Sequence, residues 1–204
     1  MVKVSRKEDA KAMITTKKEL REYLAADAKA DGRASVRATF FGDEVWKFQI
    51  ALRKLEYYKN RKGISRYLTL PLRVYYQFRH HYLSVRLGFS IATGVFDKGL
   101  AIAHYGTIVV ARTARVGQNC RIHEGVTIGA TNGSLQAPKI GNNVFIASGA
   151  KIIGDITIAD DVAIGANAVV VKSIEEQGTT WGGVPARKIS DNSSRANLNK
   201  SLFE

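Results

Sequence analysis

The sequence predicts an α+β chain in which an N-terminal α-helical domain is followed by a C-terminal parallel β-helix. Apolar residues recur every six positions after residue 90, helix signals punctuate the residues before it, and the charge balance changes at the same point. We expect residues 1–90 to form the helical domain, 91–190 the β-helix and 191–204 a flexible polar tail.

The six-residue repeat is the strongest of these signals. A helix repeats near 3.6 residues and a strand near 2, so a sustained period of six fits neither alone. It is typical of short strands and tight turns wound three to a coil. The first set of residues expected to point inward comprises Val110, Val116, Ile122, Ile128, Ile140, Ile146, Ile152, Ile158, Ile164 and Val170. A second inward set, four places later, comprises Phe96, Ile102, Ile108, Ala114, Cys120, Val126, Val144, Ala150, Ile156, Val162 and Ala168.

Helix-start and helix-stop residues divide the first third of the chain. Thr16 and Glu19 have capping-box spacing, and the pair at 31–32 (Asp-Gly) ends that helix. A second helix begins at Asp43 and ends near Gly63.

A third helix is predicted from residue 65 to 87, with an interruption or kink near Pro71. His80 and His81 are adjacent in it and point about 100° apart, so they are not paired metal ligands and are expected at the surface or in an interface. The residues expected to pack inward are Tyr75, Tyr76, Phe78, Tyr82 and Leu83.

Charge is concentrated in the helical part. Residues 1–90 carry 20 Lys or Arg against nine Asp or Glu, whereas residues 91–204 carry 11 against nine. A basic surface of this strength attracts anions such as membrane headgroups or acidic glycans, or serves mainly for solubility. No zinc-ligand set or RNA-binding signature favours nucleic acid, so we expect no such partner.

Cysteine usage and hydropathy indicate the compartment. The single cysteine, Cys120, lies on an inward beat and is expected in the core, and one cysteine forms no intrachain disulfide. No apolar stretch approaches the roughly 20 residues needed to span a bilayer, and the N-terminus lacks a signal-peptide core. We expect a cytoplasmic protein, with contact at the inner face of a membrane as one option.

One segment interrupts the coils. Residues 129–139 (GATNGSLQAPK) lack the inward aliphatic expected at position 134 and are rich in turn residues. We expect a loop that protrudes from the solenoid and serves binding or assembly.

His104 lies six residues before Val110 and twelve before Val116, at a position of the repeat where an aliphatic residue is expected. One interpretation is a hydrogen-bonded structural histidine or a local change of register. The other is a general base, because imidazole is the side chain best suited to accept a proton near neutral pH. His123, about one coil later, is the weaker candidate.

The stretch from Gly88 to Ile189 resembles the catalytic half of serine acetyltransferases and of related acetyltransferases from surface-polysaccharide pathways. The matching pieces, in order, are HYGTIVV, IHEGVTIGAT, PKIG, IGANAVVVKSI and GVPARKI. The resemblance implies a left-handed β-helix that assembles as a homotrimer, with trimers that pair as a further option. It also implies that acetyl-CoA binds in the groove between neighbouring chains, and that no metal is needed.

The resemblance also assigns roles to residues. His104 matches the catalytic histidine, and Gly129 is placed to offer a backbone N–H to the oxyanion. The positions expected to contact CoA are Ala130, Ser148, Ala166, Arg187 and Lys188, of which the last two alternatively only decorate the cap. The residues left open as orienting or acceptor-site groups are Asp97, Glu124 and Tyr105.

Three departures from the serine acetyltransferase pattern bear on the acceptor. Ala103 replaces an Asp before the histidine, and Gln136-Ala137 replaces an Arg-His pair. The aspartate that orients the histidine falls here near Phe89 or Ser90. Removing a charged partner from a binding site costs on the order of 2–5 kcal/mol. L-serine is therefore expected to be a poor acceptor.

The expected function is direct transfer of acetyl from acetyl-CoA to a hydroxyl, on a sugar of a surface polysaccharide or its precursor, with His104 as base. Serine O-acetylation, N-acetylation of an amino sugar and a non-enzymatic trimeric scaffold are the alternatives. Zinc hydration chemistry is disfavoured because it needs three histidines, and the coil region has only His104 and His123.

Overall fold

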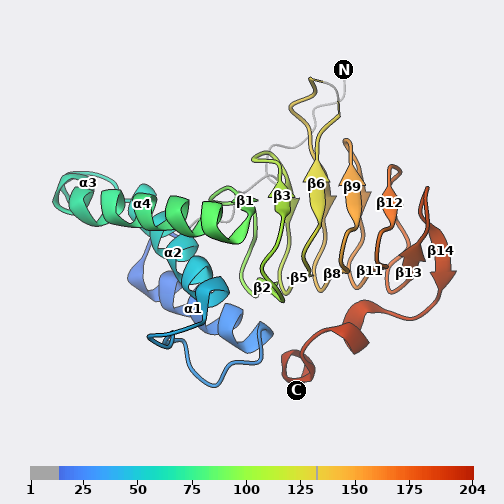
Figure 1. Cartoon of the computed structure of the whole chain (residues 1–204), viewed down its shortest axis with the longest axis horizontal. Coiled ribbons are helices and arrows are strands. Elements are labelled where there is room, and N and C mark those ends of the chain that lie inside the picture. Colours follow the sequence, from blue (N-terminus) through green and yellow to red (C-terminus); the bar gives the residue numbers. More distant parts are fainter. Residues whose placement is uncertain (1–13, 132) are drawn as a thin grey trace.

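The computed structural model describes residues 14–131 and 133–204. The start of the chain, where the sequence shows no signal-peptide core, lies outside these residues. The helices are α1 (Lys17–Ala30), α2 (Glu44–Lys59), α3 (Ile64–Leu68) and α4 (Leu70–Leu87). Figure 1 shows them at one end of a stack of coils, with the C-terminal segment running back beneath the stack. Among the described residues, no helix has the length and apolar character needed to cross a bilayer.

The helix boundaries follow the local signals closely. Thr16 caps α1, and Glu19 completes the predicted capping box by accepting from the backbone of Thr16. The predicted third helix is divided at Thr69 into α3 and α4. Pro71 then lies in the first turn of α4, where the missing N–H disturbs no helical hydrogen bond.

The strands form three parallel faces of a β-helix. The five-stranded sheet contains β1 (Phe89–Ile91), β3 (Ile108–Val110), β6 (Thr127–Gly129), β9 (Lys151–Ile153) and β12 (Val169–Val170). The three-stranded sheet contains β4 (Arg115–Val116), β7 (Lys139–Ile140) and β10 (Thr157–Ile158). The six-stranded sheet contains β2 (Ala101–Ile102), β5 (Arg121–Ile122), β8 (Phe145–Ile146), β11 (Ala163–Ile164), β13 (Thr180–Gly182) and β14 (Arg187–Ser190), of which the last is antiparallel.

The core of the solenoid is built from the two inward sets predicted by the six-residue repeat. Every member of both sets is buried, with no side chain more than 8% exposed. Cys120 is among them, and burial raises the pKa of its thiol to about 12. The structure thus confirms a helical part followed by a parallel β-helix of hexapeptide repeats.

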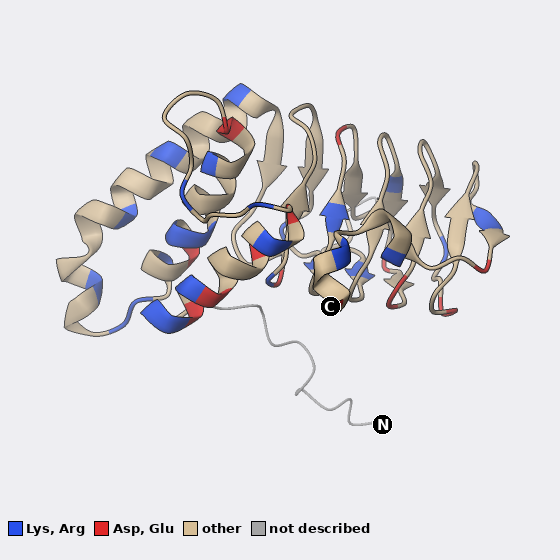
Figure 2. Ribbon diagram, turned by 90° about the horizontal axis from the view of Figure 1, so that it is seen from below, with Lys and Arg blue, Asp and Glu red and all other residues tan. Residues whose placement is uncertain are grey.

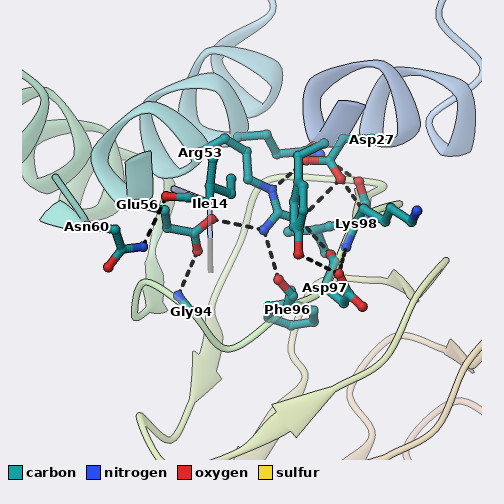
Figure 3. A network of polar contacts seen from close by, with 12 residues as sticks. Ile14, Asp27, Arg53, Glu56, Asn60, Gly94, Phe96, Asp97 and Lys98 are labelled. Carbon is teal, nitrogen blue, oxygen red and sulfur yellow. Dashed lines mark hydrogen bonds and ion pairs between the residues drawn. The ribbon is translucent and has the colours of Figure 1, made fainter. Parts of the chain in front are cut away.

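A buried arginine joins the helices to the first coil (Figure 3). The guanidinium of Arg53 in α2 donates to both carboxylate oxygens of Asp27, at 2.7 and 3.1 Å, and to Glu56 at 3.1 Å. It also donates to the carbonyls of Phe96 at 2.8 Å and Asp97 at 2.7 Å. Neither Arg53 nor Asp27 is exposed to solvent. Arg53 and its partners therefore join α1 and α2 to the first coil of the β-helix.

The carboxylates of this network also hold the backbone of the first coil. One oxygen of Asp27 accepts the N–H groups of Gly99 and Leu100, at 2.8 and 2.9 Å. Glu56 accepts the N–H of Gly94 at 2.6 Å. The first coil is thus positioned by side chains of the helical part rather than by a preceding coil.

His80 is half-buried and packs within the chain, whereas the sequence predicted a surface or interface position. Its ring lies against Phe48, with centroids 5.1 Å apart, and it is hydrogen-bonded to the backbone of Ile91. Burial, helped by the charge of Lys59, lowers the pKa of His80 to about 4.

This burial predicts a pH-dependent loss of stability. Between pH 6.5 and about 4, the unfolded chain takes up a proton at His80 that the folded chain does not. The free energy of unfolding should therefore fall as the pH is lowered through this window, by up to about 3 kcal/mol. Urea titrations of wild type and His80→Gln at several pH values measure this difference. His81→Gln, at an exposed histidine of the same helix, should keep the wild-type dependence, and a flat difference between wild type and His80→Gln would contradict the account.

The C-terminal residues are packed, so the predicted flexible tail was wrong. They form two short 3-10 helices, η1 (Ser194–Asn197) and η2 (Lys200–Phe203). Arg195 binds the carboxylate of Asp161 through two hydrogen bonds of 3.2 Å, and Leu198 is buried. The composition is polar because these contacts are made to polar corners of the coils, so no apolar pattern marked them.

Candidate functional site

One edge of the solenoid, between the six-stranded and five-stranded sheets, stacks four of the predicted site residues. The strand residues in register along the six-stranded sheet are Ile102, Ile122, Ile146 and Ile164. Two positions past each of them lie, in order, His104, Glu124, Ser148 and Ala166. We call this the His104 edge. Three of the expected site and cofactor positions therefore lie in line with His104.

His104 is exposed rather than inward, because the register of its coil differs from the next one. Val110 pairs with Ile128, 18 residues later, whereas Ile102 pairs with Ile122, 20 residues later. Two extra residues therefore lie in the corner that holds His104, and they shift it out of the inward-pointing position of the repeat. The imidazole is accessible to a substrate, as a general base must be.

His123 and Glu124 lie beside His104. The rings of His104 and His123 are edge-to-face with centroids 5.7 Å apart, and Phe145 packs against the other side of His123 at 5.2 Å. A ring nitrogen of His104, a ring nitrogen of His123 and a carboxylate oxygen of Glu124 all lie within 4.8 Å of one another. The weaker of the two candidate histidines is thus part of the cluster, and its spacing of one coil from His104 was the signal for it.

The environment lowers the pKa of both His123 and Glu124. Burial, with the nearby charges of Arg121 and His104, lowers the pKa of His123. A hydrogen bond with the Ser148 side chain lowers the pKa of Glu124. One oxygen of Glu124 and the Nε2 atom of His123 are shielded from solvent and have no hydrogen-bond partner among the described residues. The cluster therefore offers a carboxylate that can stabilise a protonated imidazole.

Other predicted residues lie elsewhere in this chain. Gly129 ends β6 and Ala130 follows it, at the edge from which the protruding loop leaves, and not at the His104 edge. Asp97 lies at the third edge, before β2, and its carboxylate accepts from the Tyr23 hydroxyl at 2.7 Å. Within one chain, Asp97 therefore lies at a different edge from His104.

The remaining candidates are at the end of the solenoid or at its surface. Arg187 and Lys188 lie in β14 and line a hollow with Trp181. The amine of Lys188 forms ion pairs with the carboxylates of Glu176 and Asp191. These carboxylates compete with any CoA phosphate for the amine. Tyr105, next to His104, is mostly exposed.

An exposed base on a β-helix edge, with a carboxylate beside it, suits proton removal from a hydroxyl during group transfer. Residues 137–172 match the family of bacterial hexapeptide transferases (six repeats). A serine acetyltransferase from Staphylococcus epidermidis is 32% identical over 197 residues, covering 91% of this chain and 86% of the relative.

Solved structures agree with this relationship. The serine O-acetyltransferase from Brucella melitensis aligns with a TM-score of 0.63 at 28% identity, covering 86% of this chain and 69% of that one. A serine acetyltransferase from Brucella abortus strain S19, in complex with coenzyme A, aligns with a TM-score of 0.54 at 27% identity, covering 86% and 68%.

Fold and sequence together define a hexapeptide-repeat acyltransferase that uses acetyl-CoA as donor. The chain belongs to the serine acetyltransferase family.

The prediction of a polysaccharide sugar as the acceptor is contradicted by these relatives. They align with most of the chain and are named serine acetyltransferases. The error came from treating the residues at 103, 136 and 137 as missing acceptor ligands. The structure shows why position 137 was misleading: Ala137 is 4% exposed and packs into the solenoid core. In this chain the side chain at position 137 therefore fills a core position.

Proposed function

We propose that this protein transfers acetyl from acetyl-CoA to the hydroxyl of L-serine. The observation that carries the proposal is the exposed His104 beside Glu124 and His123, in a chain that aligns over 91% of its length with a serine acetyltransferase.

In the proposed reaction, His104 takes the proton of the serine hydroxyl as the oxygen attacks the thioester carbonyl. A C–O bond forms and the C–S bond breaks, and the proton on His104 passes to the departing thiolate of CoA. The Glu124 carboxylate stabilises the imidazolium in between, since it carries charge beside the ring. Direct transfer needs no covalent enzyme intermediate, because both substrates are held together.

We also propose that the active unit is a homotrimer of left-handed β-helices. Within one chain, His104 is at one edge, whereas Gly129, Ala130 and the protruding loop are at another. A neighbouring chain packed side by side would bring its loop edge to the His104 edge of the first. Light scattering should give the mass of three chains, or of six if trimers pair.

An acceptor comparison tests the proposed function. Thiol release from acetyl-CoA is followed with a chromogenic reagent, with L-serine beside a panel of free sugars, oligosaccharides and sugar nucleotides. We expect release with L-serine, with L-threonine and D-serine as matched controls that turn over more slowly. Release with a sugar and none with L-serine would overturn the proposal.

A further inference from the structure

The outward surface of α3 and α4 is apolar. We call it the α3–α4 face and define it by residues that are between 60% and 77% exposed: Ile64, Tyr67, Leu68, Val74, Phe78 and Val85. In α4, Val74, Phe78 and Val85 are spaced by four and seven residues, so they share one side of the helix. Phe78 had been predicted to pack inward together with Tyr75 and Tyr82, and all three are exposed instead.

The opposite side of α4 already provides the packing that the helix needs. Leu83 and Leu87 are buried in the core, and Tyr76 packs against it. The α3–α4 face is therefore a second apolar surface that the fold of the chain does not use. Soluble monomers rarely expose large contiguous apolar patches, and those that do mostly use them for binding.

The segment that carries this face has only basic charges. From residue 57 to 96 the sequence holds seven Lys or Arg and no Asp or Glu. Figure 2 shows Lys and Arg distributed along α3 and α4. Lys62 and Arg66 are exposed on either side of Ile64, at the end of the molecule farthest from the last coils.

We propose that the α3–α4 face binds the surface of an anionic lipid bilayer. Apolar and aromatic side chains flanked by Lys and Arg are the features of an interfacial helix, which lies in the headgroup region without crossing the membrane. Anionic headgroups complement the unbalanced positive charge. A second copy of the chain would instead bring two basic faces together, and this repulsion disfavours the self-contact.

Vesicle sedimentation tests the proposal with the full-length protein. One set of vesicles is phosphatidylcholine alone, and the other contains equal parts of phosphatidylcholine and phosphatidylglycerol. We expect partition into the anionic vesicles only, weakened when salt is raised from about 0.1 M to about 1 M. Removing Lys62 and Arg66 as a Lys62→Gln/Arg66→Gln pair should weaken partition by about fivefold per charge. Ile64→Ser/Phe78→Ser should weaken it at least about tenfold.

The chain supplies a matched control for the apolar pair. Phe40 and Phe41 are even more exposed, but they lie on the loop between α1 and α2, on the other side of α2 from α4. Phe40→Ser/Phe41→Ser should leave partition unchanged. Equal binding to both kinds of vesicle, or no binding, would overturn the proposal. So would a fall in particle mass for Ile64→Ser/Phe78→Ser in light scattering without lipid, because the face would then be a contact between chains.

Discussion

Replacing Arg53 with methionine is expected to lower the free energy of unfolding by about 3–5 kcal/mol. The guanidinium is completely buried, and its removal leaves the carboxylates of Asp27 and Glu56 without their counter-charge. The carbonyls of Phe96 and Asp97 also lose their donors. Since these groups join the helices to the first coil, both parts of the protein should be affected. Denaturant unfolding followed by circular dichroism measures the change.

The matched control for this prediction is Arg37→Met, at an exposed arginine of the loop between α1 and α2. A surface substitution of this kind should change the free energy of unfolding by no more than about 0.5 kcal/mol. If Arg53→Met were as stable as Arg37→Met, the buried ion pair would not hold the two parts together.

The second large effect concerns catalysis. His104→Ala should lower kcat for acetyl transfer by about 10²–10⁴, which is the range for the loss of a general acid–base group. Because His104 is exposed, the substitution should leave the unfolding free energy close to that of wild type.

Glu124→Gln separates the base from the group proposed to stabilise it. It keeps the size of the side chain and removes the charge, so kcat should fall while the KM for acetyl-CoA stays unchanged. His81→Ala changes an exposed histidine of α4, outside the His104 edge, and should retain full activity. Equal activity of His104→Ala and His81→Ala would remove His104 from the mechanism.

The solenoid could be predicted from sequence because its core repeats locally. Each inward residue is six positions from the next, so burial of residues such as Ile122 and Ile146 follows from counting alone. The start of α1 was equally local, since the capping box spans only Thr16 to Glu19. The surface of α4 was not predictable in this way. Its apolar residues occur all round the helix, and the pattern does not tell which side meets the core.

Contacts between distant segments left no pattern to read. Arg53 looks like one more basic residue of a solvated helix, and its burial depends on Asp27 and on backbone carbonyls more than 40 residues later. The same limit applies to the site. His104 was identified as a break in the six-residue pattern, and a local change of register was one interpretation left open; the two extra residues in its corner confirm that change of register.

The acceptor could not be inferred from missing residues. The substitution at 137 was taken as the loss of an acceptor ligand, although the side chain there points into the core. A family pattern shows which positions bind substrate only when the same positions face the site in the chain at hand.

The most direct test of the account is the formation of O-acetyl-L-serine from acetyl-CoA and L-serine, followed by mass spectrometry for wild type and His104→Ala. The account predicts that product forms in step with free CoA for wild type, and that the rate falls by about 10²–10⁴ for the variant. CoA release by wild type without O-acetyl-L-serine, or an unchanged rate in His104→Ala, would contradict it.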